Sequence, residues 1–476
     1  MTMSKFLKIL FTLPIFSVLL ISCAAKVSKS ELFTADWSKM QQIINSVKEP
    51  IFPDKTYSVI DFGAVANGKF NNTEAFKKAI QTCSQKGGGT VLVPAGKYFT
   101  GPISLEDNVN FHLAEGAEIL FSTNPADYPV VHTSFEGTEL MNYAPLLSAY
   151  KKNNVAVTGK GTINGQANNE KWWSWSGGSS YGWKKGMVSQ AESLNRLRTM
   201  GDEGIPVASR VFGDGHYIRP NFVEFFECTN VMLKDIKIVD APFWVIHPIK
   251  SVNVIIDGVT VTSHGPNNDG CDPEYCKNVI IRNCSFNTGD DCIAIKSGRD
   301  GDGRRVAIPS ENIVVQNCKM FDGHGGVTIG SEISAGVRNV YVDNCDMDSP
   351  ELDRAIRIKT NTRRGGLVEN VFVRNVRVGQ VKESVLGIDL FYSVHGNQTG
   401  NYMPEVRNIF LENITVINGG KYGILAKGHK ERPIKNIIFK NVTIDTVQTK
   451  YSLQNVEKLQ FINTKINGAA IENPID

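Results

Sequence analysis

Three stretches of seven residues decide the fold: NVIIRNC at Asn278–Cys284, NIVVQNC at Asn312–Cys318 and NVYVDNC at Asn339–Cys345. In each stretch, two asparagines enclose a short apolar run of the kind that forms a β-strand with a buried face. One strand recurs with the same residues at its ends, which indicates that the chain repeats a single structural unit.

The same unit extends along most of the chain. Its first asparagine stands at residues 230, 253, 278, 312, 339, 370, 408 and 436. In six of these units a second asparagine follows five positions later. Short strands in repeats of 23 to 38 residues, without helices between them, predict an all-β parallel β-helix in which each coil buries its inward residues on the next. Stacked asparagine amides would then form a ladder of hydrogen bonds.

A β-propeller or a pair of β-sandwiches is the competing architecture. Propeller blades repeat at more regular intervals and hold four strands each, whereas these units offer two or three short strands and irregular loops. We therefore predict the β-helix.

Three cysteines, Cys284, Cys318 and Cys345, occupy equivalent positions of the repeat. Because equivalent positions of stacked coils point the same way, we expect them to be buried thiols that fill the core. A disulfide between Cys271 and either Cys276 or Cys292 is left open by the sequence.

The N-terminus carries the pattern of an export signal. Two lysines lead an apolar run that is too short to span a membrane and that ends at Cys23, in a sequence resembling a bacterial lipobox. A plain secretory signal with an incidental cysteine is the alternative. We expect a lipoprotein signal peptide at 1–22, lipidation of Cys23, a linker at 23–45 and one β-helix domain at 46–476. Such a protein would be exported to the periplasm or the cell surface of a bacterium.

One amphipathic helix is expected before the repeats. Apolar residues recur at helical spacing between residues 75 and 83, with Thr73 as the expected N-cap and glycines 87–89 after the helix. This short N-terminal helix is expected to cap one end of the stack.

A loop at 166–218 interrupts the repeat and holds four of the six tryptophans in the chain. Aromatic residues on such a loop either stack on sugar rings or anchor the loop on the coils, and anchoring is the commoner case. The formal net charge of +3 gives no support for nucleic-acid binding.

Charged residues gather between residues 264 and 359. Arg357 and Lys359 are two apart on a predicted strand, so both leave the same face while Ile356 and Ile358 turn inward. Two adjacent cations suit a carboxylated sugar, although a solvated basic face would be the usual reading of this pair alone.

Three aspartates stand near this pair. Strict alternation in the run after Asp291 would turn that side chain inward, but a bend at Gly289 and Asp290 would let both carboxylates reach a groove. Stacking of coils would bring Asp269 beside them, and His324 follows one coil later between two glycines. Clustered carboxylates raise the pKa of at least one member, which supplies the protonated acid and the ionised base that glycoside hydrolysis requires.

These residues fall into four short motifs: Asn267-x-Asp269, Asp290-Asp291, Gly-His324-Gly and Arg357-x-Lys359. The motifs, in this order on this repeat, resemble those of glycoside hydrolase family 28, the polygalacturonases and related pectin hydrolases. The similarity covers nearly everything from Tyr57 to the C-terminus. It implies a right-handed parallel β-helix of the pectin-hydrolase type.

The resemblance also implies inverting hydrolysis of the bond next to a galacturonic acid residue. It makes Asp290 the general acid, Asp269 and Asp291 the residues that activate water, and His324 a residue that tunes the acid. Inversion predicts acid and base carboxyls roughly 6.5 to 9.5 Å apart. The substrate carboxylate would bind Arg357 and Lys359.

Further residues are expected to line the substrate groove. These are Asn267, Tyr392, Lys296, Trp244, His247 and Arg219. Trp244 and His247 could equally be packing residues at a coil corner. We expect a pectic polysaccharide or oligogalacturonide as substrate, no cofactor or metal ion, contact with a membrane only through the lipid anchor, and a monomer.

Three other functions compete with a polygalacturonase. A rhamnogalacturonan hydrolase, or a hydrolase of another galacturonate linkage, would use the same motifs. A pectate lyase shares the β-helix but needs calcium and a strong base, and a non-catalytic β-helix would only bind glycan. The insertion at 166–218 is the expected block at one end of the groove, which would make the enzyme exo-acting.

Overall fold

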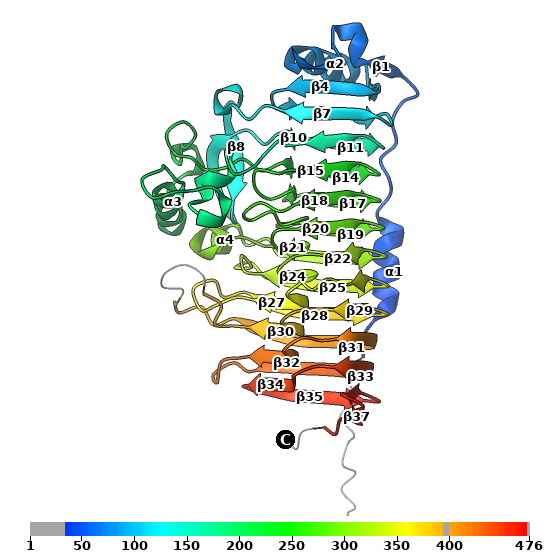
Figure 1. Ribbon diagram of the computed structural model, residues 1–476, viewed down its shortest axis with the longest axis vertical. Coiled ribbons are helices and arrows are strands. Elements are labelled where there is room, and N and C mark those ends of the chain that lie inside the picture. The colour runs from blue at the N-terminus through cyan, green and yellow to red at the C-terminus, as the bar shows by residue number, and fades with distance from the viewer. Residues whose placement is uncertain (1–33, 394–398, 474–476) are drawn as a thin grey trace, which may run out of the picture. The chain divides into compact units, whose positions relative to one another are not determined.

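The computed structural model describes residues 34–393 and 399–473. The predicted signal peptide, Cys23 and the first part of the predicted linker lie outside the described residues. From Ala35 the chain forms one compact unit, a stack of coils in which parallel strands repeat on three faces (Figure 1). The predicted parallel β-helix is confirmed.

The first and second faces belong to one 25-stranded sheet. The first face holds the long strands of the repeat: β1 (Thr56–Ser58), β3 (Gly89–Val93), β6 (Val109–Leu113), β11 (Asn153–Gly159), β14 (Thr229–Lys234), β17 (Val252–Asp257), β19 (Lys277–Arg282), β22 (Ser310–Gln316), β25 (Val337–Asp343), β28 (Leu367–Arg374), β31 (Glu405–Asn418), β33 (Ile434–Thr446) and β35 (Val456–Ile462). The second face holds β2 (Asn67–Asn71), β4 (Gly96–Thr100), β7 (Ala117–Phe121), β12 (Thr162–Asn164), β15 (Lys237–Val239), β18 (Thr260–Ser263), β20 (Ser285–Thr288), β23 (Lys319–Met320), β26 (Asp346–Met347), β29 (Arg377–Gln380), β36 (Lys465–Ile466) and β37 (Ala469–Ala470).

The third face carries the functional surface. Its strands are β5 (Ile103–Ser104), β10 (Leu147–Tyr150), β13 (Val223–Phe226), β16 (Ile246–Ile249), β21 (Ile293–Ile295), β24 (Val327–Gly330), β27 (Arg354–Lys359), β30 (Ser384–Asp389), β32 (Tyr422–Lys427) and β34 (Thr449–Gln454). Single bridges through Cys271 and Glu274 join β16 to β21. The antiparallel hairpin of β8 (Val130–Phe135) and β9 (Thr138–Tyr143) stands apart from these faces.

Asparagine ladders hold the coils in register. From Asn108 to Asn436, each amide of the first ladder donates to the asparagine of the preceding coil at 2.8 to 3.2 Å. Each ladder residue has a positive φ near 55°, a conformation that asparagine tolerates better than most residues. The second ladder is less regular than predicted, because Asn375 donates to Asp343 rather than to Asn344.

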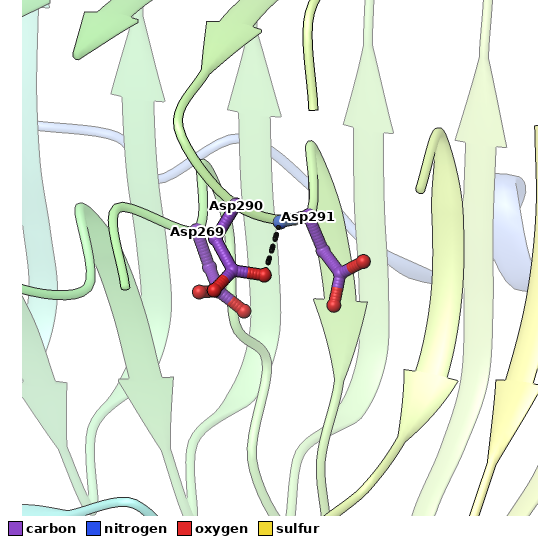
Figure 2. A group of neighbouring side chains, drawn as sticks. All are labelled: Asp269, Asp290 and Asp291. Carbon is purple, nitrogen blue, oxygen red and sulfur yellow. Dashed lines mark hydrogen bonds between the residues drawn. The ribbon is translucent and has the colours of Figure 1, made fainter. Parts of the chain in front are cut away.

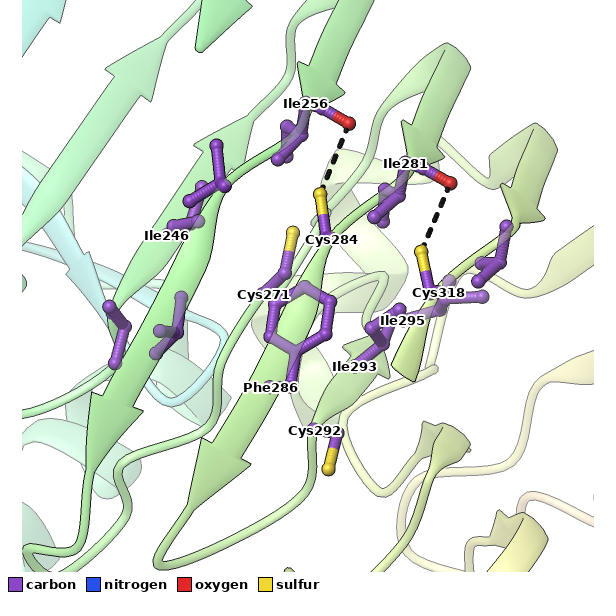
Figure 3. Close-up of a cluster of buried hydrophobic side chains, with 14 of the residues drawn as sticks. Ile246, Ile256, Cys271, Ile281, Cys284, Phe286, Cys292, Ile293, Ile295 and Cys318 are labelled. Carbon is purple, nitrogen blue, oxygen red and sulfur yellow. Dashed lines mark hydrogen bonds between the residues drawn. The ribbon is translucent and has the colours of Figure 1, made fainter. Parts of the chain in front are cut away.

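The core is aliphatic and contains thiols. All eight described cysteines are buried and unbridged, so the disulfides that the sequence left open do not form in the structure. Cys284 and Cys318 each donate to a carbonyl of the preceding coil, that of Ile256 and that of Ile281 (Figure 3). The prediction of buried thiols at the repeat position is confirmed.

Helix α2 (Thr73–Gln85) caps one end of the stack, as predicted. The ring of Phe76, on this helix, packs on Tyr98 and Phe111 of the first coils. Thr73 is the first helical residue and not the N-cap, because its hydroxyl accepts a hydrogen bond from the backbone N–H of Gly101 instead.

The prediction that the linker extends to residue 45 is wrong for residues 37–45. These residues belong to helix α1 (Trp37–Ser46), which lies against the outside of the first face. Met40 and Ile43 of the helix are buried. Val47, which follows the helix, is buried beside outward apolar residues of successive strands, and Ile44 and Phe52 pack against the same cluster: Ala156, Met232, Ile255 and Ile280. Such an apolar stripe needs a cover, and the amphipathic helix supplies one.

Helix α3 (Ala191–Glu203) lies within the insertion, and helix α4 (Asp300–Val306) follows β21. The tryptophans of the insertion anchor it: Trp172 is buried against Trp175 and Tyr128, and the indole N–H of Trp173 donates to the carbonyl of Ala241. Within the described ranges, no helix is long and apolar enough to cross a membrane.

The ladder generates a first prediction. Asn312→Ala removes two amide bonds and places alanine at a φ of 60°, so we expect a loss of about 2–3 kcal/mol of stability, whereas Asn312→Gly, which accepts this φ, should lose about 1 kcal/mol less. Guanidinium unfolding of both variants measures this. If both variants unfolded at the same guanidinium concentration, the left-handed backbone conformation at residue 312 would not contribute to the loss of stability.

Candidate active site

The predicted site residues lie where the second face turns into the third. Backbone bonds tie this turn from coil to coil: the N–H of Val245 donates to Asp269, that of Gly270 to Asp291 and that of Cys292 to Gly325, at 2.8 to 2.9 Å. Asp269 and Asp291 are therefore in register on adjacent coils, as the stacking argument predicts.

The three aspartates form one cluster (Figure 2). One carboxylate oxygen from each lies within 4.8 Å of those of the other two, a grouping of a kind that can bind a cation. Close backbone approach makes this possible, because a Cβ at Gly289 would stand 2.6 Å from the carbonyl of Gly265 and one at Gly270 would stand 2.4 Å from that of Cys292.

Asp291 is fully buried, and the cation pair binds it. Lys359 Nζ lies 2.7 Å from Asp291 Oδ2, while Arg357 Nη1 and the Thr328 hydroxyl donate to Oδ1 at 3.2 and 2.8 Å. Burial alone would raise the pKa of Asp291, but the two cations hold it far below the usual range. The expectation that this carboxylate reaches the groove is wrong, since its partners on β27 enclose it.

Asp269 is buried but lines the cavity. Burial and the nearby charge of Asp290 raise the pKa of Asp269 to about 7, although Lys296 Nζ stands 3.5 Å from its Oδ2. Asp272, fully buried beside it, has a pKa well above its usual range because of burial and of Asp269. Asp269 and Asp272 are therefore the carboxyls in this region that hold their protons most strongly.

Asp290 is paired with the imidazole of His324. Nδ1 of His324 lies 3.0 Å from Oδ1 of Asp290, and the ring is about half exposed. Burial would raise the pKa of Asp290, but the hydrogen bond from His324 lowers it. The same bond raises the pKa of His324 to about 9. Asp290 is thus an ionised carboxylate beside an imidazolium.

A cavity of about 340 Å³ opens over this cluster. It is lined by Glu136, Trp244, Asn267, Asp269, Asp290, Lys296, Arg299, His324, Ser331, Glu332, Asp353, Arg357, Lys359, Arg364 and Tyr392. All the predicted motif residues except Asp291 therefore line this cavity, together with Trp244, Lys296 and Tyr392. Lys296 Nζ lies 4.7 Å from the centre of the Trp244 ring.

Two predicted groove residues do not line the cavity. Arg219 is fully buried and donates to Asn267 Oδ1 and to the carbonyl of Pro266, at 2.8 and 2.6 Å, so it positions the Asn267 side chain. His247 is buried behind Trp244, where its Nε2 lies 2.9 Å from Glu274. Both face the protein interior because loops cover the third face there.

Six further residues line the cavity without belonging to any sequence motif: Glu136, Arg299, Ser331, Glu332, Asp353 and Arg364. These residues come from the β8–β9 turn and from loops at the ends of third-face strands. Isolated loop charges of this kind carry no motif, and only the register of the coils brings them together.

The block at one end of the third face is the β8–β9 hairpin. Its Thr133 donates to Glu224 of β13 at 2.7 Å, so the hairpin covers strands that precede the aspartate cluster. None of the described residues of 166–218 lines the cavity; the insertion supports the hairpin from behind, with Arg198 2.7 Å from Glu136. The hairpin thus gives the cavity its lining residue Glu136, and a block by the insertion stays a prediction.

Known proteins resemble the chain over most of its length. Residues 210–465 match the model of Glycosyl hydrolases family 28, and residues 56–114 match that of Rhamnogalacturonase A/epimerase, pectate lyase-like. The solved structure of a hyperthermoactive exopolygalacturonase from Thermotoga maritima is 43% identical, with a TM-score of 0.89 over 92% of this chain and 97% of that one.

Two curated relatives are more distant. A probable polygalacturonase of Vitis vinifera is 28% identical over 81% of this chain and 74% of its own length. An exo-poly-alpha-D-galacturonosidase of Dickeya chrysanthemi is 26% identical over 86% of this chain and 70% of its own length.

Proposed function

The chain belongs to Glycosyl hydrolases family 28, and we propose that it is an exo-acting polygalacturonase, which hydrolyses the bond next to a galacturonic acid residue at the end of a pectic chain. The observation that carries this proposal is the cavity itself. It combines the aspartate cluster and the Arg357–Lys359 pair with a wall that blocks one end.

The carboxylates divide the proton transfers between them. Asp290, once protonated, gives its proton to the oxygen of the leaving sugar, and Asp269 takes a proton from the attacking water. In the free enzyme the lowered pKa of Asp290 and the raised pKa of Asp269 favour the opposite protonation, so the reactive form is the minor one in which the proton that the pair shares lies on Asp290. Of the two predicted bases only Asp269 lines the cavity, so we give Asp291 a positioning role through Arg357 and Lys359.

His324 completes this cycle. After cleavage Asp290 has lost a proton and Asp269 has gained one, so Asp269 must release its proton to water and Asp290 must regain one before the next turnover. The imidazolium of His324, hydrogen-bonded to Asp290 and half exposed to solvent, is the group placed to deliver it.

Cavity size and closure favour exo action. A volume of about 340 Å³ lies at the small end of the range of ~300–1,000 Å³ for ligand pockets, and the β8–β9 hairpin lies against β13, where Thr133 donates to Glu224. The end of the substrate chain therefore enters the cavity. The rest of the polysaccharide lies on the open side, where His324 stands.

Rhamnogalacturonan hydrolysis is the second candidate. The match to the rhamnogalacturonase model covers residues 56–114, which contain none of the cavity residues, so it does not bear on the bond that is cleaved. Export, lipidation of Cys23 and a monomeric state stay predictions.

Product analysis on polygalacturonate tests the proposal. We expect saturated monogalacturonate as the first product, no absorbance from unsaturated ends, and a loss of about 10³-fold or more in kcat for Asp290→Asn.

Arg357→Ala should chiefly harm activity on uronate substrates. Glu311→Gln, on the first face, is the matched control and should keep full activity. A ladder of oligomers would contradict exo action, and unsaturated products would identify a lyase.

The pH dependence follows from the proton that Asp269 and Asp290 share. Below the raised pKa of Asp269, about 7, this pair holds its proton, and above it the proton is lost. We therefore predict that kcat/KM falls as pH rises through about 7, while His324, with a pKa of about 9, stays charged. A decline that begins only near pH 9 would assign the essential proton to His324 instead.

The stereochemical outcome is a separate prediction. The two carboxyl groups lie near each other, since one carboxylate oxygen of Asp269 stands within 4.8 Å of one of Asp290. The family resemblance still predicts inversion. Because the aspartates are crowded, the attacking water fits beside them only if the sugar binds above the cluster. NMR of the first product decides: an inverted anomer supports a single displacement, and a retained anomer would make one aspartate a nucleophile.

A further inference from the structure

Four residues form what we call the rear wall of the cavity: Glu136, Arg299, Glu332 and Arg364. They come from the β8–β9 turn, from the loop before α4, and from the loops after β24 and β27. Arg299 Nη1 lies 2.7 Å from Glu136 and 3.6 Å from Glu332, and Arg364 Nη2 lies 3.5 Å from Glu332. None of the four belongs to a predicted motif or to the acid–base machinery.

Both acids of the rear wall are ionised. Burial would raise the pKa of each, but Arg198 and Arg299 lower that of Glu136 to about 2, and Lys296, Arg364 and Arg299 hold that of Glu332 well below its usual range. An ionised carboxylate is only a hydrogen-bond acceptor, so a cavity that ends on two of them favours a ligand that presents hydroxyl groups.

The wall is also closed. The turn at Gly137 has a φ of 79°, and a Cβ there would stand 2.9 Å from the backbone nitrogen of Arg299 and 3.0 Å from the Cβ of Glu332. That nitrogen donates to the carbonyl of Gly137 at 2.9 Å. A polysaccharide cannot continue through such a contact, so the sugar against it must be terminal.

The space between the cleavage site and the rear wall is about one residue of substrate deep. Lys296 Nζ lies 3.5 Å from Asp269 Oδ2 and 3.3 Å from Glu332 Oε2, so one ammonium group spans the gap. Asp290, the proposed acid, lies beside the half-exposed His324, where the leaving group departs. The sugar at the wall is then the non-reducing one, whose 4-hydroxyl is free.

We propose that Glu136 and Glu332 accept the free 4-hydroxyl of the non-reducing terminal uronate, so that the site selects saturated chain ends. This inference rests on the proposed function. β-Elimination removes the substituent at C4 and leaves a C4–C5 double bond, so fragments made by lyases lack the hydroxyl that the wall binds. Hydrolysis, which leaves a 4-hydroxyl on every new non-reducing end, is the class of reaction that supplies this substrate.

The test compares kcat/KM on saturated trigalacturonate with that on the 4,5-unsaturated trimer. Wild-type enzyme should prefer the saturated trimer by about 100-fold or more, because a site that binds a hydroxyl rejects an analogue without one. Glu332→Gln and Glu136→Gln should each lose most of this preference by slowing the saturated trimer alone. The control Glu311→Gln should retain it, and unfolding midpoints check that every variant folds.

The outcomes separate this inference from the proposed function. If wild-type enzyme cleaves both trimers equally well, selection of the chain end is refuted while the hydrolase stands. If both glutamine variants keep the wild-type preference, the two glutamates do not read the hydroxyl. If neither trimer is cleaved, the proposed polygalacturonase activity itself fails.

Discussion

Every functional distance in this protein depends on the backbone hydrogen bonds between adjacent coils. The bonds from Gly270 to Asp291 and from Cys292 to Gly325 set the spacing of the turn that carries the aspartates. Each coil contributes only one or two reactive groups, and the stack supplies the rest. The asparagine ladders and glycine contacts matter because a shifted register would separate these groups.

Charge balance is the second constraint. Fully buried ions are stable only when they are paired, and here several of the pairs share an ion. Lys296 lies between Asp269 and Glu332, while Arg357 and Lys359 share Asp291. As a result one carboxylate is left with a raised pKa and its neighbour with a lowered one. That asymmetry gives two chemically identical side chains different parts in a proton transfer.

The sequence predicts those parts of the structure that repeat. Asn312 and its equivalents reveal the repeat in the sequence because each coil needs a residue with a positive φ at the same position, which asparagine tolerates. The four motifs are predictable because they lie on stacked turns of this repeat. Arg219, expected in the groove, faces the interior, and for His247 the packing alternative holds. No local sequence pattern shows that other segments cover the third face above these two residues. Helix α1 and the rear wall are not predictable from the sequence, because the residues that they contact lie hundreds of positions away along the chain or several coils away in the stack.

The central claim is that a single terminal sugar occupies the space between the aspartate cluster and the rear wall. A crystal structure of the Asp290→Asn variant with trigalacturonate measures this directly. The account predicts one ring in the cavity beside Lys296, with its 4-hydroxyl within hydrogen-bond distance of Glu136 or Glu332 and the other two rings on the side of His324. A trisaccharide that extends past the hairpin on both sides of the aspartates would contradict it.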